Sequence, residues 1–215
     1  MRELPGYYPA FLNINDQRCV VIGGGLVARR KVGMLLECGA SVVVISPDCC
    51  AELDRMVEKG EIQAIRRHYR AGDLRGARIV IAATDDKNVN REIVQEARKE
   101  AVLVNVVDDA ELSDFIVPAY LRRGEVTIAV STAGRSPALA RKIKARLERD
   151  FGEEYAALVR LIGEVRHQIR QQGVEVDGDA WQEAIDLDWL IDLLRAGQSD
   201  KAKSVLLDSL MARQK

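Results

Sequence analysis

Three consecutive glycines, Gly23–Gly25, constrain this chain most, because they separate an apolar run from a helical pattern without any spacer. Residues 19–22 are Cys-Val-Val-Ile, which is typical of a buried strand, and the apolar residues after the glycines recur at helical spacing. A second strand-like run at 41–45 completes a unit of about 30 residues. The stretch therefore predicts the strand, tight turn and helix of a dinucleotide-binding unit.

Each small residue of this turn has an expected task. Gly23 permits the sharp exit from the strand, and Gly25 lets the backbone approach a pyrophosphate. Ala28 stands where the third glycine of the motif allows close packing of helix on strand. The first turn of the helix offers unpaired N–H groups and its dipole to the phosphates. A purely structural glycine turn is the alternative.

Composition limits the other classes of function. The 215 residues carry 32 basic and 33 acidic side chains, a net charge of -1, so neither nucleic acid nor a membrane surface is an expected partner. No apolar stretch approaches the roughly 20 residues of a membrane span, which favours the cytoplasm. The four cysteines show no C-x-x-C spacing, and His68 and His167 are far apart, so no metal site is expected.

Strand and helix patterns alternate through residue 109, which predicts an α/β fold with a Rossmann-like, doubly wound parallel sheet. The second helix is expected to begin at Pro47-Asp48. Further strands are expected at 62–65, 77–83 and 101–107.

The pattern changes after residue 112. Two β-rich runs, 115–119 and 126–131, are separated by a connector at 120–125 and predict an antiparallel hairpin or a pair of strands in a different sheet. Ser136-Pro137 is expected to start a helix. This α+β segment covers 113–150, and a small all-helical domain is expected over 151–215.

Ligands of such sheets collect beyond the carboxyl ends of the strands. Ser46 stands about 20 residues past the glycines, where NAD-selective sites carry an acidic residue for the ribose. The Ser46 hydroxyl or the Asp48 carboxylate could bind that ribose instead. No arginine directly follows this strand to bind a 2′-phosphate, which favours NAD over NADP.

Asp108 is the candidate catalytic carboxylate, because it ends a buried strand beside the expected nicotinamide position. It could accept a proton while a hydride leaves for the cofactor, and Asp109 as a like-charged neighbour would raise its pKa. The alternative is that Asp108 or Asp109 caps the following turn.

Six motifs together carry a family resemblance. They are YYPAFLN at 7–13, VIGGGLVARRK at 21–31, AATDD at 82–86, NVVDD at 105–109, DFIVPA at 114–119 and STAGRSPALA at 131–140. Through about residue 150 the chain resembles the precorrin-2 dehydrogenase family, the dehydrogenase and ferrochelatase module of siroheme synthesis.

The resemblance implies an NAD-binding Rossmann domain at 1–112, a segment at 113–150 that builds a homodimer, and a helical tail at 151–215. It implies oxidation of precorrin-2, a tetrapyrrole polycarboxylate, to sirohydrochlorin. Some family members also insert ferrous iron into that product.

The resemblance also assigns residues. It places the catalytic aspartate on Asp108 and the NAD contacts on the glycine turn, on Leu26 and Val27, and on Ser46, Pro47 and Asp48. By position, Thr84, Asp85 and Asn105 would also face the cofactor. The competing function is an NAD-binding regulatory sensor without turnover, in which Asp108 has no task.

Overall fold

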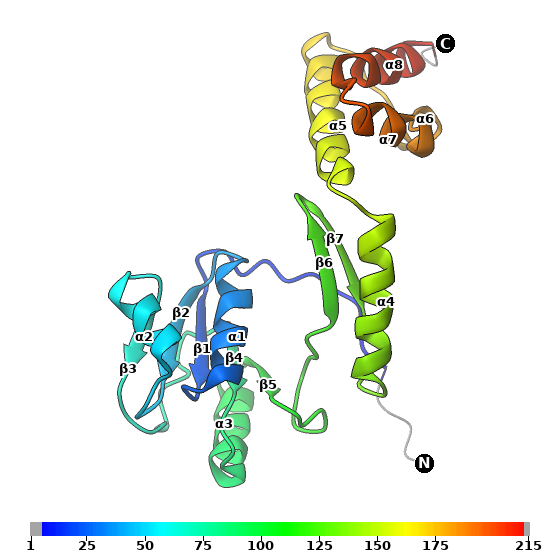
Figure 1. Cartoon of the computed structure of the whole chain (residues 1–215). Helices are drawn as coiled ribbons and strands as arrows, with labels where there is room; N and C mark the ends of the chain where they lie inside the picture. Colours follow the sequence, from blue (N-terminus) through cyan, green and yellow to red (C-terminus); the bar gives the residue numbers. More distant parts are fainter. Residues whose placement is uncertain (1–5, 213–215) are drawn as a thin grey trace. The chain divides into compact units, whose positions relative to one another are not determined.

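The computed structural model describes residues 6–212, which form two compact units (Figure 1). The first unit ends at Val117 and the second begins at Pro118. Residues 113–117 therefore belong with the first unit, and the finer division into three domains stays a prediction.

The first unit is a five-stranded parallel sheet with the strand order β3-β2-β1-β4-β5. This order confirms the predicted Rossmann-like α/β fold, and it reverses direction between β1 and β4. The strands are β1 (Arg18–Ile22), β2 (Ser41–Ile45), β3 (Gln63–Ile65), β4 (Ile79–Ala82) and β5 (Leu103–Val106), and the helices are α1 (Leu26–Leu36), α2 (Ala51–Glu58) and α3 (Lys87–Lys99).

Alternate residues of the strands build an apolar layer on each face of the sheet. Val21 packs in one layer with Val32 of α1 and Leu53 of α2. Its neighbour Val20 packs in the other layer with Ile93 of α3. Helices α1 and α2 thus cover one face and α3 the other, as continuous apolar strands require.

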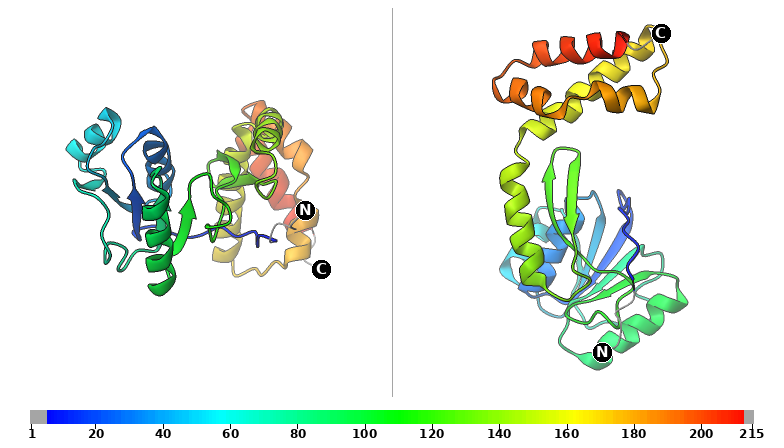
Figure 2. Two further views of the ribbon diagram at one scale, coloured as in Figure 1. Left: turned by 90° about the horizontal axis from the view of Figure 1, so that it is seen from below. Right: turned by 90° about the vertical axis from the view of Figure 1, so that its right-hand side faces the viewer.

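The second unit contains a β-hairpin and five helices. Strands β6 (Ala119–Arg123) and β7 (Val126–Val130) are antiparallel, and α4 (Pro137–Asp150) lies along the hairpin (Figure 2). Helices α5 (Glu154–Gln171), α6 (Gly178–Ala184), α7 (Leu187–Arg195) and α8 (Ser199–Met211) share a separate apolar core. Among residues 6–212, no helix is long and apolar enough to cross a membrane.

The first strand of the hairpin differs from the prediction. A strand was predicted at 115–119, which was wrong, because β6 covers Ala119–Arg123 and so includes most of the residues expected to form the connector. Phe115 packs instead against the apolar layer beneath α1, while Arg123 Nε donates to the Phe151 carbonyl at 3.0 Å. The hydrogen bond to Phe151, which is distant in the sequence, therefore gives the Arg123 side chain a partner within the strand.

One helix boundary also differs. Helix α2 begins at Ala51 rather than at Pro47-Asp48. Its N-cap residue Cys50 is extended, and the Cys50 N–H donates to the Gly24 carbonyl at 2.8 Å. Helices α6 and α7 are separate, and the Asp186 carboxylate between them accepts from the Trp189 N–H at 3.1 Å and caps α7.

Candidate dinucleotide-binding site

Backbone hydrogen bonds continue past the ends of the strands and hold four segments at one edge of the sheet. The Gly23 N–H donates to Ile45, the Ala83 N–H to Ile22 and the Val107 N–H to Ala82, at 2.8–2.9 Å. The residues that follow β1, β2, β4 and β5 therefore emerge together. Where β1 meets β4 the strand order reverses, and ligands of this fold bind at that point.

The three glycines of the turn differ in their surroundings. Gly23 has φ +118°, and a Cβ there would overlap the Ala83 carbonyl oxygen. A Cβ on Gly24 would overlap the carbonyl oxygen of Asp48. A Cβ on Gly25 would meet no described atom within 4 Å. Gly23 and Gly24 thus allow neighbouring backbone segments to approach the turn closely, and Gly25 leaves open space on its side of the turn.

The start of α1 fits a phosphate. Gly25 is the N-cap, no side chain among the described residues caps it, and the first turn holds no acidic residue. The first helical bond runs from the Arg29 N–H to the Gly25 carbonyl at 3.0 Å, so the N–H groups before it stay available. Leu26 and Val27 are 71% and 41% exposed, whereas Ala28 is fully buried against the sheet.

The segment after β2 lies against this turn. Ser46 is buried and its N–H donates to the Ile65 carbonyl at 3.2 Å, while Pro47 and Asp48 are exposed. Arg66, the first residue after β3, forms an ion pair with Asp54 of α2. The hydrogen bond to Asp54 is the main cause of the raised pKa of Arg66, and Asp48 also contributes. The strand order thus brings Arg66 to the residues that follow β2.

The segment after β4 is fixed by its own polar groups. Thr84 Oγ1 accepts from the Asp86 N–H at 3.2 Å, and Asp86 caps α3 through the Asn88 and Val89 N–H groups. Asn90 Nδ2 donates to the Thr84 carbonyl at 3.0 Å, and its Oδ1 is the buried side-chain acceptor without a partner in the described structure. Asp85 is exposed at the tip of this segment.

Asp108 stands exposed in a tight turn after β5, with φ +61°. The Asp109 N–H closes that turn on the Val106 carbonyl at 3.2 Å. The Asp109 carboxylate accepts from the Leu112 N–H at 3.1 Å, so the turn-capping role that was open to either aspartate is taken by Asp109.

Lys31 of α1 lies within electrostatic reach of the Asp108 carboxylate. Burial is the main cause that lowers the pKa of Lys31, and Arg30 lowers it further. The Asp108 carboxylate acts in the opposite direction and favours the charged ammonium.

Asn105 supports the Asp108 turn from behind. Its Nδ2 donates to the Phe115 carbonyl at 2.9 Å, so this buried amide holds the returning chain. Ser113 Oγ accepts from the Val106 N–H at 2.9 Å and donates to the Asp109 carbonyl at 2.6 Å. A cofactor contact of Asn105 stays a prediction, as do those of Thr84 and Asp85.

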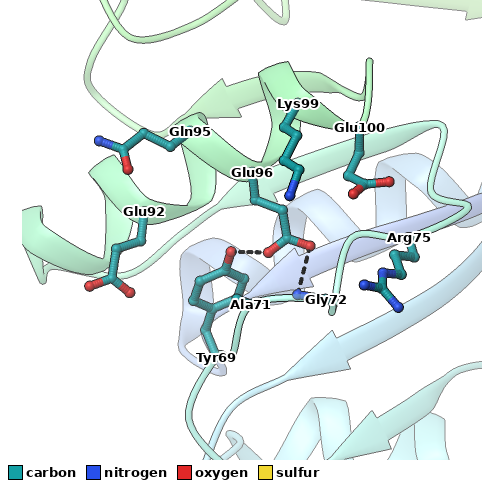
Figure 3. Close-up of a pocket in the computed structure, with 9 residues that line it drawn as sticks. All are labelled: Tyr69, Ala71, Gly72, Arg75, Glu92, Gln95, Glu96, Lys99 and Glu100. Carbon is teal, nitrogen blue, oxygen red and sulfur yellow. Dashed lines mark hydrogen bonds between the residues drawn. The ribbon is translucent and has the colours of Figure 1, made fainter.

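A cavity of about 420 Å³ lies away from this edge, between the β3–β4 connector and the second half of α3 (Figure 3). The Glu96 carboxylate accepts there from the Tyr69 hydroxyl and from the Gly72 and Leu74 N–H groups, the latter two at 3.0 Å. Because this half of α3 leads to the start of β5, the cavity faces the opposite edge of the sheet. Its central carboxylate stabilises the connector.

No group of three potential metal ligands occurs in the part of the chain that the structure describes. The sequence analysis included Gly24 in the glycine turn but gave it no task of its own, and it did not identify Arg66 or Asn90. The position of Arg66 depends on which strands are neighbours.

Comparison with known proteins agrees with this geometry. Residues 10–119 match the family model described as putative NAD(P)-binding. The chain belongs to this family. Residues 123–150 match a second model, that of the central region of a sirohaem biosynthesis protein.

Curated relatives of this NAD(P)-binding chain include siroheme synthases, which confirms the resemblance inferred from the motifs. The siroheme synthase of Methylococcus capsulatus is 38% identical to this chain, and the match covers 94% of this chain and 43% of that protein. The siroheme synthase of Chromobacterium violaceum is 41% identical to this chain, and the match covers 80% of this chain and 36% of that protein. The chain thus spans less than half the length of these relatives.

The fold also matches a solved structure, SirC, named a precorrin-2 dehydrogenase. The TM-score is 0.72 at 26% identity, and the match covers 94% of this chain and 98% of that chain. The similarity therefore extends over both compact units of the chain.

The glycine contacts yield a stability prediction. Gly24→Ala should lower the free energy of unfolding by about 1–3 kcal/mol, because the new methyl group overlaps the Asp48 carbonyl. Gly33→Ala, in the middle of α1 with open space around its Cβ, should instead raise it by about 0.5–1 kcal/mol. Denaturant unfolding of both variants measures the difference, and equal effects would contradict the proposed packing of the turn.

Proposed function

We propose that this protein is an NAD-dependent dehydrogenase that oxidises precorrin-2 to sirohydrochlorin in siroheme biosynthesis. The observation that carries the proposal is one edge of the sheet that presents both the open side of Gly25 and the exposed Asp108 carboxylate. The likeness to SirC over 98% of that protein supports it. None of the four cysteines is part of a disulfide, which fits a cytoplasmic enzyme.

The residues around the turn would hold the cofactor. The first-turn N–H groups of α1 bind the pyrophosphate, and Gly25 admits it because no side chain fills that space. Ser46, Pro47 and Asp48 border the ribose, and Leu26 and Val27 offer an exposed apolar surface beside the phosphates. When bound, NAD accepts the hydride that the reduced macrocycle loses.

Asp108 would accept the proton that leaves with this oxidation. Its carboxylate is exposed at the edge of the sheet, on a turn whose geometry is fixed by Asn105 and Ser113. Because these supports bind Asp109 and the returning chain, the Asp108 carboxylate stays available to a substrate. The Lys31 ammonium stabilises it electrostatically.

Cofactor binding is tested at Gly25. Gly25→Val should raise the dissociation constant of NAD⁺ at least tenfold, which corresponds to about 1.4 kcal/mol, because the side chain fills the space for the pyrophosphate. Its φ of -83° and ψ of -174° suit valine, so the fold should persist. Titration calorimetry measures the loss, with Gly33→Ala as the control that keeps its affinity. An unchanged titration would overturn the site.

Turnover is tested at Asp108. Asp108→Asn should lower kcat for precorrin-2 oxidation by about 10²–10⁴, the range of general-base catalysis, while NAD⁺ still binds. Asparagine tolerates the positive φ, so the turn is kept. The anaerobic reaction is followed by absorbance and compared with Glu111→Gln, an exposed carboxylate nearby.

Retained turnover in Asp108→Asn would remove Asp108 as the base. An unaltered protein that binds NAD⁺ but never oxidises precorrin-2 would match the regulatory sensor instead. Repeating the assay with ferrous ion tests whether the same protein also inserts iron into sirohydrochlorin.

We further propose that the protein is a homodimer formed through α4 and the adjoining hairpin. Ala140 is the buried residue of α4, while the apolar side chains of Leu139 and Ile143 are 50% and 37% exposed. Such an apolar face is more typical of a subunit contact than of a monomer surface.

The dimer proposal predicts a change of mass. Replacing both Leu139 and Ile143 by glutamate should yield monomers at concentrations where the unaltered protein is dimeric, because two charges would enter the contact. Light scattering measures the mass. Leu187→Glu, at another exposed leucine of the second unit, should remain dimeric. A monomeric unaltered protein would refute the proposal.

A further inference from the structure

The ribose end of the site has an unusual charge arrangement. Strand β2 is followed by Ser46, a buried uncharged residue, where NAD-selective sites usually present a carboxylate. The carboxylate of Asp48 stands two residues later and is exposed. Beside it, from the neighbouring strand β3, comes the Arg66 guanidinium. In other sites of this fold, an arginine near the ribose accommodates the 2′-phosphate of NADP.

Arg66 is not free to act as such a ligand. It forms an ion pair with Asp54 on α2, and both side chains are partly exposed. Asp48 and Cys49, which lie on the segment after β2, are the other titratable groups that act on it. The Arg66 guanidinium is thus paired with the Asp54 carboxylate of α2, and the Asp48 carboxylate on the segment after β2 acts on it electrostatically.

We propose that Asp48 and Asp54 make this site select NAD over NADP by covering Arg66 with negative charge, so that Arg66 is a latent ligand for a 2′-phosphate. The inference rests on the proposed dinucleotide site but not on the substrate. A 2′-phosphate adds close to two negative charges beside two carboxylates, whereas the 2′-hydroxyl of NAD adds none. Removing one carboxylate should therefore change the affinity for NADP⁺ much more than the affinity for NAD⁺.

The test compares dissociation constants of NAD⁺ and NADP⁺ by calorimetry for the unaltered protein, Asp48→Asn and Glu61→Gln. In Asp48→Asn the ratio of the NADP⁺ affinity to the NAD⁺ affinity should rise about tenfold, as expected for one nearby unit charge in a partly solvated site, because the removed charge opposes only the 2′-phosphate. The Asp48 contact with Gly24 is made by its backbone carbonyl, so asparagine should keep the fold, which thermal unfolding checks.

Glu61→Gln is the matched control. It removes the same charge from an exposed carboxylate that precedes β3, at the other end of the strand from Arg66. It should leave the ratio of the two dissociation constants unchanged. An equal change in Asp48→Asn and Glu61→Gln would overturn the inference, since it would reflect net charge alone.

Arg66→Gln in the Asp48→Asn background tests the arginine itself. It should abolish the tenfold gain for NADP⁺, because the gain requires the guanidinium. A gain that persists without Arg66, or an unaltered protein that binds NADP⁺ as tightly as NAD⁺, would overturn the inference while leaving the dinucleotide site standing. Failure of the unaltered protein to bind either dinucleotide would overturn the proposed function as well.

Discussion

The first unit depends on how closely other backbone segments approach the turn after β1. The Ala83 carbonyl lies where a Cβ of Gly23 would be, and the Asp48 carbonyl lies where a Cβ of Gly24 would be. The Cys50 N–H then donates back to Gly24. These contacts fix the exits of β1, β2 and β4 relative to one another, and with them the direction in which α1 presents its first N–H groups.

Regular parts of this unit could be predicted because their signals are local. Buried parallel strands give nearly continuous apolar runs such as 79–82, and the helices between them repeat at 3.6 residues. Strand β6 gave no such signal, because Arg122 and Arg123 interrupt its apolar pattern. Its pairing is set by the hairpin register, with Arg123 opposite Val126, and by the distant Phe151 carbonyl.

In the candidate site, too, some residues could be predicted from local sequence signals and others could not. Gly23, Gly25 and Asp108 could be singled out because each lies at the end of a recognisable strand. Arg66 could not, since its relevance follows from the adjacency of β3 and β2 in the sheet. The choice between Asp108 and Asp109 as the turn cap also required the structure, because both are equally placed in the sequence and only the hydrogen bond from Leu112 distinguishes them.

The backbone at Asp108 restricts which residues suit this turn. A left-handed conformation such as its φ of +61° costs most non-glycine residues roughly 1–2 kcal/mol, but aspartate and asparagine adopt it more readily. The turn is nevertheless held from outside by Asn105 and Ser113, so its shape does not depend on which side chain occupies this position. Backbone geometry thus suits aspartate and asparagine alike. The proposed role of Asp108 as proton acceptor is what requires the carboxylate rather than the amide.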